Sequence, residues 1–560
     1  MFFFKERAIQ YSTGLFVAML VTAPLVPVVY QSFLSTPIYD AVDHITLSNY
    51  MRFLAHPVFH EALVNSVVLA CIATVIATCL GVGIAVLVAR TNMPLRGLIA
   101  SSMLVPMYVP QLVLAFGWLV LYGPAGYVTL EFRQLFGFIP WNFYTVAGMS
   151  VLAGMASTPM VYLLCIGSLR LLDSSLEGAA RSVGARPWTV IRHVIVPMIR
   201  PAIVYSAMLN FIASLELLSI PLIFGAPARL MFFTTFLYVE GGKNTVPDYG
   251  LVGSAAVFLL VLITLLLFVQ GLLLRKLARF TSVRGKASRS LTFDLGRWKY
   301  AATAAVLFFF VFSIGLPILG LVVRSFVEFL TPLMAPWELT TLANYQMIFE
   351  QEAYVRSIRN SVVVAGFGGL LATVLVALVA LVVHRSDFPF RRQLEFVAIY
   401  PRAVPGMIAG IGLFWAMLWI PFLTPLHGTI WILIIAFTMR NIPAAFGALS
   451  PMLLQIDRDL DRGARSVGAD WWTTCRTIIL PLAKNGLFAA YVLLFISFFK
   501  EYASAAFLFA HGSEIIGTTM LEFWGSGNTG AMAALGTIQL AITCVFVMGA
   551  RKILGVKLYD

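Results

Sequence analysis

The sequence predicts an all-α integral membrane protein with about twelve transmembrane helices, arranged as two parallel six-helix repeats that each carry a cytoplasmic cassette. Composition sets this class, because 60% of the 560 residues are hydrophobic and only 11% are charged. Apolar runs of about 20 residues, long enough to cross a bilayer as helices, recur along the whole chain. In addition, a polar segment, which we call the cassette, occurs twice. Its two copies share six identical residues in a row, at 180–185 and 464–469.

Six apolar segments in each half are predicted to span the membrane. In the first half they are 13–30, 61–89, 98–122, 146–169, 201–224 and 251–273. In the second half they are 300–323, 358–383, 394–420, 428–449, 485–509 and 530–550. The first segment is interpreted as a retained helix and not as a cleaved signal peptide, because a similar span opens the second half, where no signal peptide can act.

The distribution of basic residues predicts the topology. With both termini in the cytoplasm, cytoplasmic segments hold 29 of the 38 Lys and Arg residues, and this count includes Arg440 in the segment 440–484. The positive-inside bias therefore places both termini and both cassettes in the cytoplasm. The net charge of +13 is explained by topology, and no basic soluble module that would bind nucleic acid is present in the sequence.

The duplication extends well beyond the cassettes. Early residues recur 295 positions later, among them Asn49 as Asn344, Arg90 as Arg385, Pro106 as Pro401 and Pro110 as Pro405. At the cassettes the spacing is 284, so eleven residues have been lost, and we expect the external segment 123–145 to account for them. Six helices per unit predict parallel repeats. The chain is divided into a first unit at 1–274, a basic cytoplasmic linker at 275–299 and a second unit at 300–560.

Each cassette is predicted to form a helix, a glycine elbow and a second helix. In the first copy Asp173 or Ser174 can cap the helix, and Glu177 completes a capping box with Ser174. Gly184 then ends this helix, and Pro187 suits the first turn of the next one. One basic loop would be interpreted as a solvated connection. Two copies with the same small-residue elbow favour a surface that another protein approaches closely.

The cassettes resemble the EAA motif of bacterial ABC importer permeases. In each copy a glycine precedes an apolar-x-apolar-Pro ending: Gly184 before 194–197, and Gly468 before 478–481. The fused two-unit arrangement covers nearly the whole chain and is similar to ferric-iron-type permeases and their thiamine- and polyamine-importing relatives. One departure is that Gly178 and Arg462 occupy the usual position of the motif's glutamate, while acids stand one place earlier.

The resemblance implies that the cassettes are coupling helices, which sit in grooves of ATP-binding subunits. The residues it assigns to this coupling are Glu177, Ala180, Arg181, Gly184, Asp461, Ala464, Arg465 and Gly468. Because of the departure at Gly178 and Arg462, the family's salt bridges to the ATPase are not carried over.

Other components of the system are expected to be separate proteins. No Gly-x-x-x-x-Gly-Lys-Ser/Thr stretch is present, so an ATP-binding subunit dimer in the cytoplasm would bind ATP and Mg, and this chain would have no catalytic residue, metal or cofactor. The external segments 36–60, 226–250 and 324–357 are too short for a ligand-binding domain. A periplasmic or extracellular solute-binding protein is therefore expected outside, and the chain itself in the bacterial inner membrane.

Charged residues within apolar spans are the candidates for the translocation path, because such charges are costly and usually face a cavity or a partner. They are Glu216, Arg402, Lys500 and Glu501. Arg402 lies between Pro401 and Pro405, where broken helical hydrogen bonding would expose backbone to a pore. Two interpretations stay open. Lys500 or Arg402 pairs with Glu501 or Glu216 as a brace between the units, or these residues form a gate.

We expect the permease subunit of a binding-protein-dependent ABC importer that works by alternating access, with ferric iron as the cargo implied by the resemblance. The basic residues of the path favour an anion and the glutamates a bare cation, so an organophosphonate or phosphate ester, thiamine and a polyamine stay open. A secondary transporter driven by an ion gradient also uses repeated six-helix halves and is the rival from another class. It would transport without a partner protein.

Overall fold

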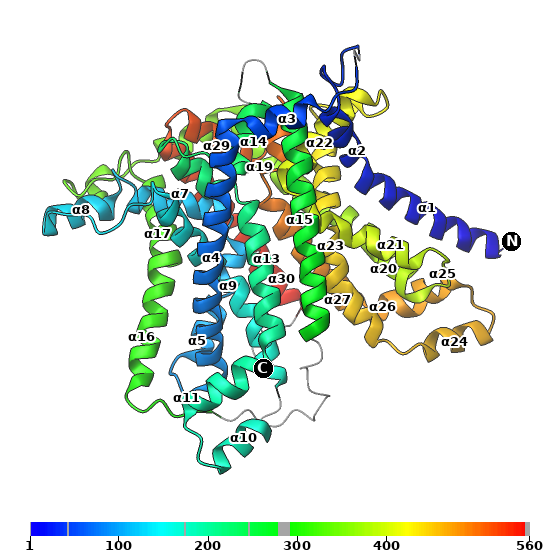
Figure 1. Cartoon of the computed structure of the whole chain (residues 1–560), viewed down its shortest axis with the longest axis horizontal. Coiled ribbons are helices and arrows are strands. Elements are labelled where there is room, and N and C mark those ends of the chain that lie inside the picture. The colour runs from blue at the N-terminus through cyan, green and yellow to red at the C-terminus, as the bar shows by residue number, and fades with distance from the viewer. Residues whose placement is uncertain are drawn as a thin grey trace.

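The computed structural model describes residues 2–41, 44–172, 175–242, 244, 247–277 and 292–554. Within these ranges the chain is helical, and its β-type pairing is limited to three isolated bridges (Figure 1). Nine of the described helices are long and apolar enough to cross a membrane, or twelve if each of three sharply bent helix pairs is one span. The predicted all-helical membrane class is confirmed.

The helices of the first unit begin with two helices separated by a short break and end with a long apolar helix. In chain order they are α1 (Phe2–Thr22), α2 (Leu25–Ser32), α3 (Ser48–Ala55), α4 (Pro57–Arg90), α5 (Arg96–Ser102), α6 (Val105–Tyr108), α7 (Gln111–Tyr122), α8 (Tyr127–Phe136), α9 (Val146–Leu171), α10 (Ser175–Ser182), α11 (Pro187–Val190), η1 (Ile191–Ile195), α12 (Val196–Met198), α13 (Arg200–Leu215), η2 (Pro221–Gly225), α14 (Phe233–Gly242) and α15 (Tyr249–Leu277).

The second unit repeats this order. Its helices are α16 (Trp298–Phe310), η4 (Val311–Gly315), α17 (Leu316–Ser325), η5 (Pro336–Leu339), α18 (Ala343–Glu350), α19 (Glu352–Val363), η6 (Val364–Gly368), α20 (Gly369–Arg385), α21 (Arg391–Ile399), η7 (Tyr400–Ala403), α22 (Gly406–Trp419), η8 (Thr424–Leu426), α23 (Ile430–Gln455), α24 (Asp459–Ser466), α25 (Trp471–Thr474), η9 (Cys475–Ile479), α26 (Leu480–Leu482), α27 (Lys484–Phe499), α28 (Ala505–Leu508), α29 (Ile516–Gly525) and α30 (Thr529–Leu554).

The extra residues of the first unit lie where the spacing predicts them. Between α7 and α9 the chain forms α8, whereas the corresponding connection between α22 and α23 holds only the short turn η8. In Figure 1, α8 projects from the left edge of the molecule. From α9 onwards the two units keep the 284 spacing, since α9 and α23 have the same length of 26 residues.

The first helix of each unit packs between its own unit and the other one. α2 contacts both α15 of its own unit and α22 of the second unit, while α17 contacts α30 and α7. At these crossings Gly412 faces Pro24 and Gly117 faces Pro317, so closely that a Cβ on either glycine would collide with the proline carbonyl. Small residues at a helix crossing allow such an approach. The Trp118 indole N–H also donates to Ser313 O at 3.0 Å.

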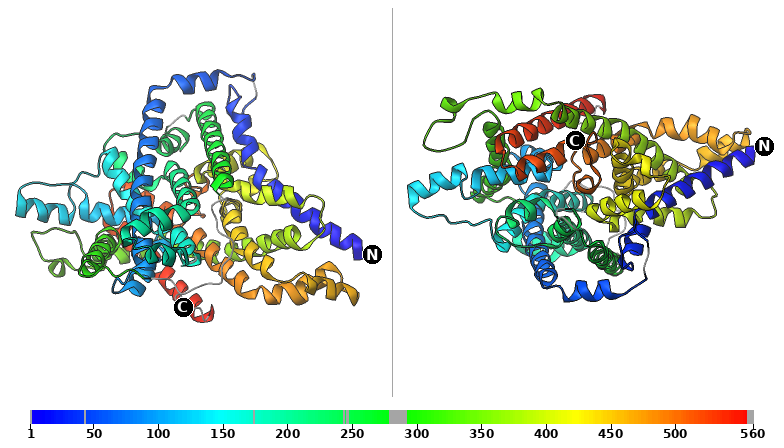
Figure 2. Two further views of the ribbon diagram at one scale, coloured as in Figure 1. Left: turned by 60° about the horizontal axis from the view of Figure 1, so that its bottom comes forward. Right: turned by 90° about the horizontal axis from the view of Figure 1, so that it is seen from above.

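These contacts of α2 and α17 with both units hold the two units together in space, although the units are separate along the sequence. The division at 1–274 and 300–560 stays a prediction about sequence units. Most of the predicted linker, residues 278–291, lies outside the described residues. The views in Figure 2 show α1 extending along the second unit, next to its cassette.

Five of the twelve expected spans are not continuous helices, and this part of the prediction was wrong. The segment 13–30 is interrupted between α1 and α2. The segment 98–122 divides into α5, α6 and α7, with Pro106 and Pro110 at the divisions. The segment 394–420 bends by 107° between η7 and α22, because Pro405 has no N–H and keeps Val404 extended. The segments 201–224 and 485–509 leave the helical path after Leu215 and Phe499.

Candidate functional site

Both cassettes end their first helix in the same way. Gly184 and Gly468 have φ values of +81° and +86°, which glycine adopts without a Cβ penalty. After each glycine an N–H returns at 3.1 Å to a carbonyl five residues earlier, from Ala185 to Ala180 and from Ala469 to Ala464. This closure is typical of a glycine-terminated helix. The predicted helix, elbow and second helix are confirmed in α10–α11 and in α24–α25.

Helix capping differs between the copies. In the second cassette the Asp470 carboxylate accepts a hydrogen bond from Thr473 N at 2.8 Å and caps α25, whereas α11 begins at Pro187 as predicted. The predicted caps of α10, Asp173 and Ser174, lie outside the described residues.

A buried arginine anchors each cassette to its own transmembrane unit. Arg90 Nη2 lies 3.1 Å from Glu177 Oε1, with both side chains fully buried, and Arg385 Nη1 lies 2.6 Å from Asp461 Oδ2. Burial raises the pKa of the Glu177 carboxyl, and the positive charge of Arg90 opposes this rise. The two carboxylates therefore attach the cassettes to the ends of α4 and α20.

The same arginines also hold the ends of the following spans. Arg90 donates to the carbonyl of Leu169 at 2.8 Å, and Arg385 donates to the carbonyls of Leu453 and Ile456. Leu169 and Leu453 are repeat partners at the spacing of 284. Each arginine thus links two membrane helices to one cassette, and the link is present in both units.

The exposed side of each cassette carries apolar residues at matching positions. Val183 and Val467, next to the elbow glycines, are 84% and 83% exposed. Leu176 and Leu460, seven residues earlier in each copy, are also exposed. A Cβ added at either elbow glycine would meet no atom within 4 Å. We call these residues the elbow surfaces: Leu176, Val183 and Gly184 in the first copy, and Leu460, Val467 and Gly468 in the second.

The remaining coupling candidates lie beside the elbows or beneath them. Arg181 donates to Thr292 O at 3.1 Å and lies 4.2 Å from the centre of the Phe293 ring, so it binds the end of the linker. Arg465 lies 3.4 Å from the Asp387 carboxylate. Ala180 is half-buried and Ala464 is buried under its cassette.

The charged candidates of the predicted spans lie at helix breaks. Glu216 and Lys500 are the first residues after α13 and α27, Glu501 follows Lys500, and Arg402 lies in η7. The loss of regular helix at these points brings the four residues together with the middle of α23. We call this group, together with Arg440, the charged cluster.

Arg440 joins the two glutamates of the charged cluster. Its Nη2 lies 3.2 Å from Glu216 Oε2, and its Nε lies 3.3 Å from Glu501 Oε2. Glu216 belongs to the first unit and Arg440 and Glu501 to the second. An ionic brace between the two units therefore exists, which agrees with the first of the two open interpretations. The basic residue that forms it is Arg440 and not Lys500 or Arg402.

Arg402 and Lys500 instead contact neutral oxygens of the first unit. Both terminal nitrogens of Arg402 lie 3.2 Å from Tyr205 Oη, and its guanidinium carbon lies 5.6 Å from the Tyr205 ring centre. Lys500 Nζ donates to Met107 O at 2.9 Å. The pairing of Lys500 or Arg402 with a glutamate, which was part of one open interpretation, is not present among the described residues, where Arg440 contacts both carboxylates.

A cavity of about 460 Å³, called the central cavity below, opens beside the charged cluster. Side chains of both units line it: Tyr205, Glu216, Pro401, Arg402, Val404, Arg440, Asn441, Pro443, Ala444 and Gly447. Lys500 and Glu501 are not among these lining residues. The structure thus brings all four sequence candidates into one cluster and exposes two of them to the cavity.

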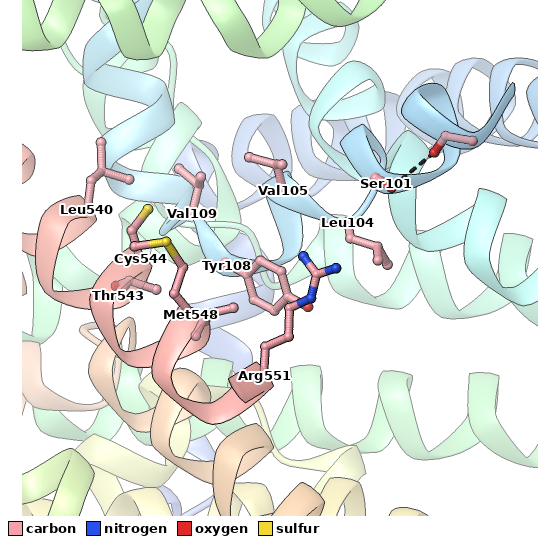
Figure 3. Close-up of a pocket in the computed structure, with 12 residues that line it drawn as sticks. Ser101, Leu104, Val105, Tyr108, Val109, Leu540, Thr543, Cys544, Met548 and Arg551 are labelled. Atoms are coloured by element: carbon pink, nitrogen blue, oxygen red, sulfur yellow. Dashed lines mark hydrogen bonds between the residues drawn. The ribbon is translucent and has the colours of Figure 1, made fainter. Parts of the chain in front are cut away.

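A second cavity, of about 700 Å³, separates α5 and α6 from α30 (Figure 3). It is lined mainly by apolar residues such as Leu104, Val105 and Met548, with Ser101 hydrogen-bonded to Gly97 O at 3.0 Å. Arg551 is the one charged residue in this lining. The cavity lacks the paired charges that distinguish the first one.

Sequence reasoning missed Arg440 and Tyr205. Arg440 was counted as cytoplasmic, but it lies in the middle of α23, so the predicted cytoplasmic share of Lys and Arg falls from 29 to 28 of 38. Its position inside the apolar segment 428–449 was a signal that it belonged with the path candidates. Tyr205 gave no comparable signal, since a tyrosine in a span is ordinary.

Comparisons with known proteins agree with the duplicated architecture. Residues 77–279 and 369–558 each match the family described as binding-protein-dependent transport system inner membrane component. The chain is 26% identical over 513 residues to the ferric transport system permease protein FbpB of Actinobacillus pleuropneumoniae, covering 90% of this chain and 73% of the relative. It is 27% identical over 478 residues to the putative ferric transport system permease protein FbpB 1 of Haemophilus influenzae, covering 84% and 73%.

Among solved structures, the chain is similar to a bacterial ABC transporter involved in the import of the acidic polysaccharide alginate. The alignment has a TM-score of 0.38 and 17% identity, and it covers 46% of this chain and 96% of that chain.

Proposed function

The chain belongs to the family of binding-protein-dependent transport system inner membrane components, and from this membership we propose that it is the transmembrane permease subunit of an ATP-driven importer of ferric iron. The observation that supports iron is the similarity to ferric transport permeases over most of the chain, including both units. The protein is a transport subunit of the inner membrane.

The ATPase partner is proposed to dock on the two elbow surfaces. Each surface offers an exposed valine beside a glycine that leaves room for a partner backbone, and a dimer of ATP-binding subunits would place one subunit on each. ATP and Mg would be bound by these subunits. The Arg90–Glu177 and Arg385–Asp461 pairs would then carry the cassette movement into the membrane helices.

Both termini and both cassettes are placed in the cytoplasm in this proposal, and a separate solute-binding protein would deliver the cargo on the opposite face. In Figure 1, α3, α14 and α29 lie at the top of the molecule, away from α10 and α24. Closure of the ATPase dimer would move the cassettes together and change access to the central cavity. Hydrolysis would reset the transporter.

The charged cluster is proposed to line the translocation path. It lies where broken helices of both units meet, and its Arg440 bridge would be broken and remade as the units move. A charge at this depth needs a partner at every stage of the cycle, because an unpaired charge in a membrane protein is costly.

A second candidate cargo is a small anionic solute such as an organophosphonate or phosphate ester. The observation in its favour is that, among the described residues, Arg402 and Lys500 form hydrogen bonds with a phenolic oxygen and a backbone carbonyl and no ion pair. A thiamine or polyamine cargo, which is cationic, has no such support from this cluster.

The test is uptake into proteoliposomes that contain the chain with its ATPase and receptor. Labelled ferric iron and a labelled phosphonate are compared, each with and without the ATPase. ATPase-dependent iron uptake supports the proposal, and ATPase-dependent uptake of the phosphonate alone replaces iron with the anion. Uptake that does not need the ATPase would instead support a gradient-driven carrier.

A further inference from the structure

We propose that the central cavity holds an oxyanion site, which takes a carboxylate or phosphate group of the transported species, and that Arg402 is its principal ligand. The transported species carries this group either as a ligand of ferric iron or as part of its own structure. That the ligand is a transported species rests on the proposed function, whereas the site itself rests on the charges around the cavity.

The charges of the cluster leave Arg402 without a counter-ion. Arg440 forms ion pairs with both Glu216 and Glu501, so both negative charges of the cluster are paired with one guanidinium. Arg402 and Lys500 make no ion pair within the described part of the chain. The five side chains therefore carry one net positive charge between the helices of a membrane protein, where an uncompensated charge is unfavourable.

The geometry of Arg402 suits an oxyanion. A guanidinium has five N–H donors in a planar fork that matches a carboxylate or phosphate. The hydrogen bonds to Tyr205 use two of these donors, and the ring of Tyr205 lies close to the guanidinium. Tyr205 thus fixes the orientation of Arg402, which leaves three donors for a bound group.

The cavity around Arg402 accommodates such a group. Its volume of about 460 Å³ exceeds that of a phosphate or a small carboxylic acid, and its lining includes the amide of Asn441. Asn441 donates through Nδ2 to Phe437 O, which fixes the amide in place. Glu216 also lines the cavity, but its charge is held by Arg440, so Arg402 remains the available charge.

The site exists once in the chain, although the fold is duplicated. At the repeat spacings the counterparts of Arg402, Arg440 and Tyr205 are Met107, Ala156 and Ala489, which have no charge. Arg402 comes from the second unit and Tyr205 from the first. One site between two units is the arrangement that a single shared path requires.

The test measures binding of labelled inorganic phosphate and of labelled citrate to the purified full chain in complex with its ATPase, by equilibrium dialysis without ATP. Arg402→Gln should weaken binding of the bound anion at least tenfold, and Arg402→Lys should weaken it less because the charge is kept. Arg133→Gln on the exposed helix α8 is the matched control and should bind like the wild type.

Citrate and phosphate distinguish the two kinds of oxyanion group that the site could bind. Binding of citrate alone identifies a carboxylate group, whereas binding of phosphate alone identifies a phosphate group. The uptake comparison of labelled ferric iron with the labelled phosphonate then shows whether an iron complex or the solute itself carries this group. Wild-type binding that is unchanged in Arg402→Gln overturns the site, and so does a wild-type chain that binds neither anion.

Failure of the site and failure of the proposed function give different results. If the anion binds through Arg402 but uptake does not need the ATPase, the site stands and the importer proposal fails. If uptake needs the ATPase but Arg402→Gln binds and transports like the wild type, the importer proposal stands and the site fails. Arg402→Lys separates misfolding from loss of the ligand, because this charge-retaining variant should bind the anion more tightly than Arg402→Gln does.

Discussion

The two cassettes of this chain share their elbow and their anchoring ion pair, whereas the charged cluster is not duplicated. Arg90 and Arg385 make the same ion pairs and the same carbonyl contacts in the two units. In the cluster, Arg440 has an alanine as its counterpart and Lys500 has Glu216. The two cassettes would therefore face a partner with two equal subunits, whereas the charged cluster, which occurs once, would line a single translocation path.

The largest expected effect comes from removing the bridge of the cluster. Arg440→Leu leaves Glu216 and Glu501 close together, partly buried and without their cation, and breaking a buried pair costs about 3–5 kcal/mol. We expect a marked fall in thermal stability of the purified protein. Adding Glu216→Gln and Glu501→Gln should restore most of it, and an Arg440→Leu protein as stable as the wild type would contradict the bridge.

The anchors of the two cassettes should behave alike. Arg90→Leu and Arg385→Leu each leave an acid buried, with a cost of about 3 kcal/mol that is somewhat smaller in the second unit, where Asp461 is partly exposed. Hydrogen exchange should rise in 175–199 for the first variant and in 459–483 for the second. Faster exchange in only one of the two would show that the duplication is one of sequence and not of function.

The elbows should affect partner binding more than folding. Gly184→Arg and Gly468→Arg place a side chain at a positive φ, which costs about 1 kcal/mol, in a position with open space around it. Each variant should insert into the membrane at normal levels and lose affinity for the ATP-binding subunit. Gly97→Arg, on α5 and also without near neighbours, is the control for an added arginine and should bind the ATPase normally.

The smallest effect is expected at Tyr205. Tyr205→Phe removes one hydrogen-bond acceptor but keeps the ring beside Arg402, and such a loss is typically worth about 1 kcal/mol. We expect little change in thermal stability and a several-fold weaker binding of the anion. An unchanged anion affinity would show that Arg402 is oriented by other contacts.

The sequence predicts the repeated features well, because hydrophobic length and identity between copies are visible without a structure. The elbows at Gly184 and Gly468 follow from local turn chemistry. The packing of α2 and α17 against both units was not predictable from the sequence. The contact of Gly117 with Pro317, for example, depends on packing between segments that are far apart in the chain.

The cluster was only partly predictable for a related reason. Pro401 and Pro405 indicate a break in the ninth span, but nothing local ends α13 before Glu216 or α27 before Lys500. The partner of each charge depends on where these breaks meet. Arg440 was therefore assigned to the cytoplasm, although its apolar surroundings in the sequence contradict that assignment.

The most direct measurement is the number of ATP-binding subunits that one chain holds in the absence of nucleotide, determined by native mass spectrometry. Two docking cassettes imply two subunits on the wild-type chain, one on Gly184→Arg or Gly468→Arg, and none on the double variant. Two subunits on the double variant would contradict docking at the elbow surfaces.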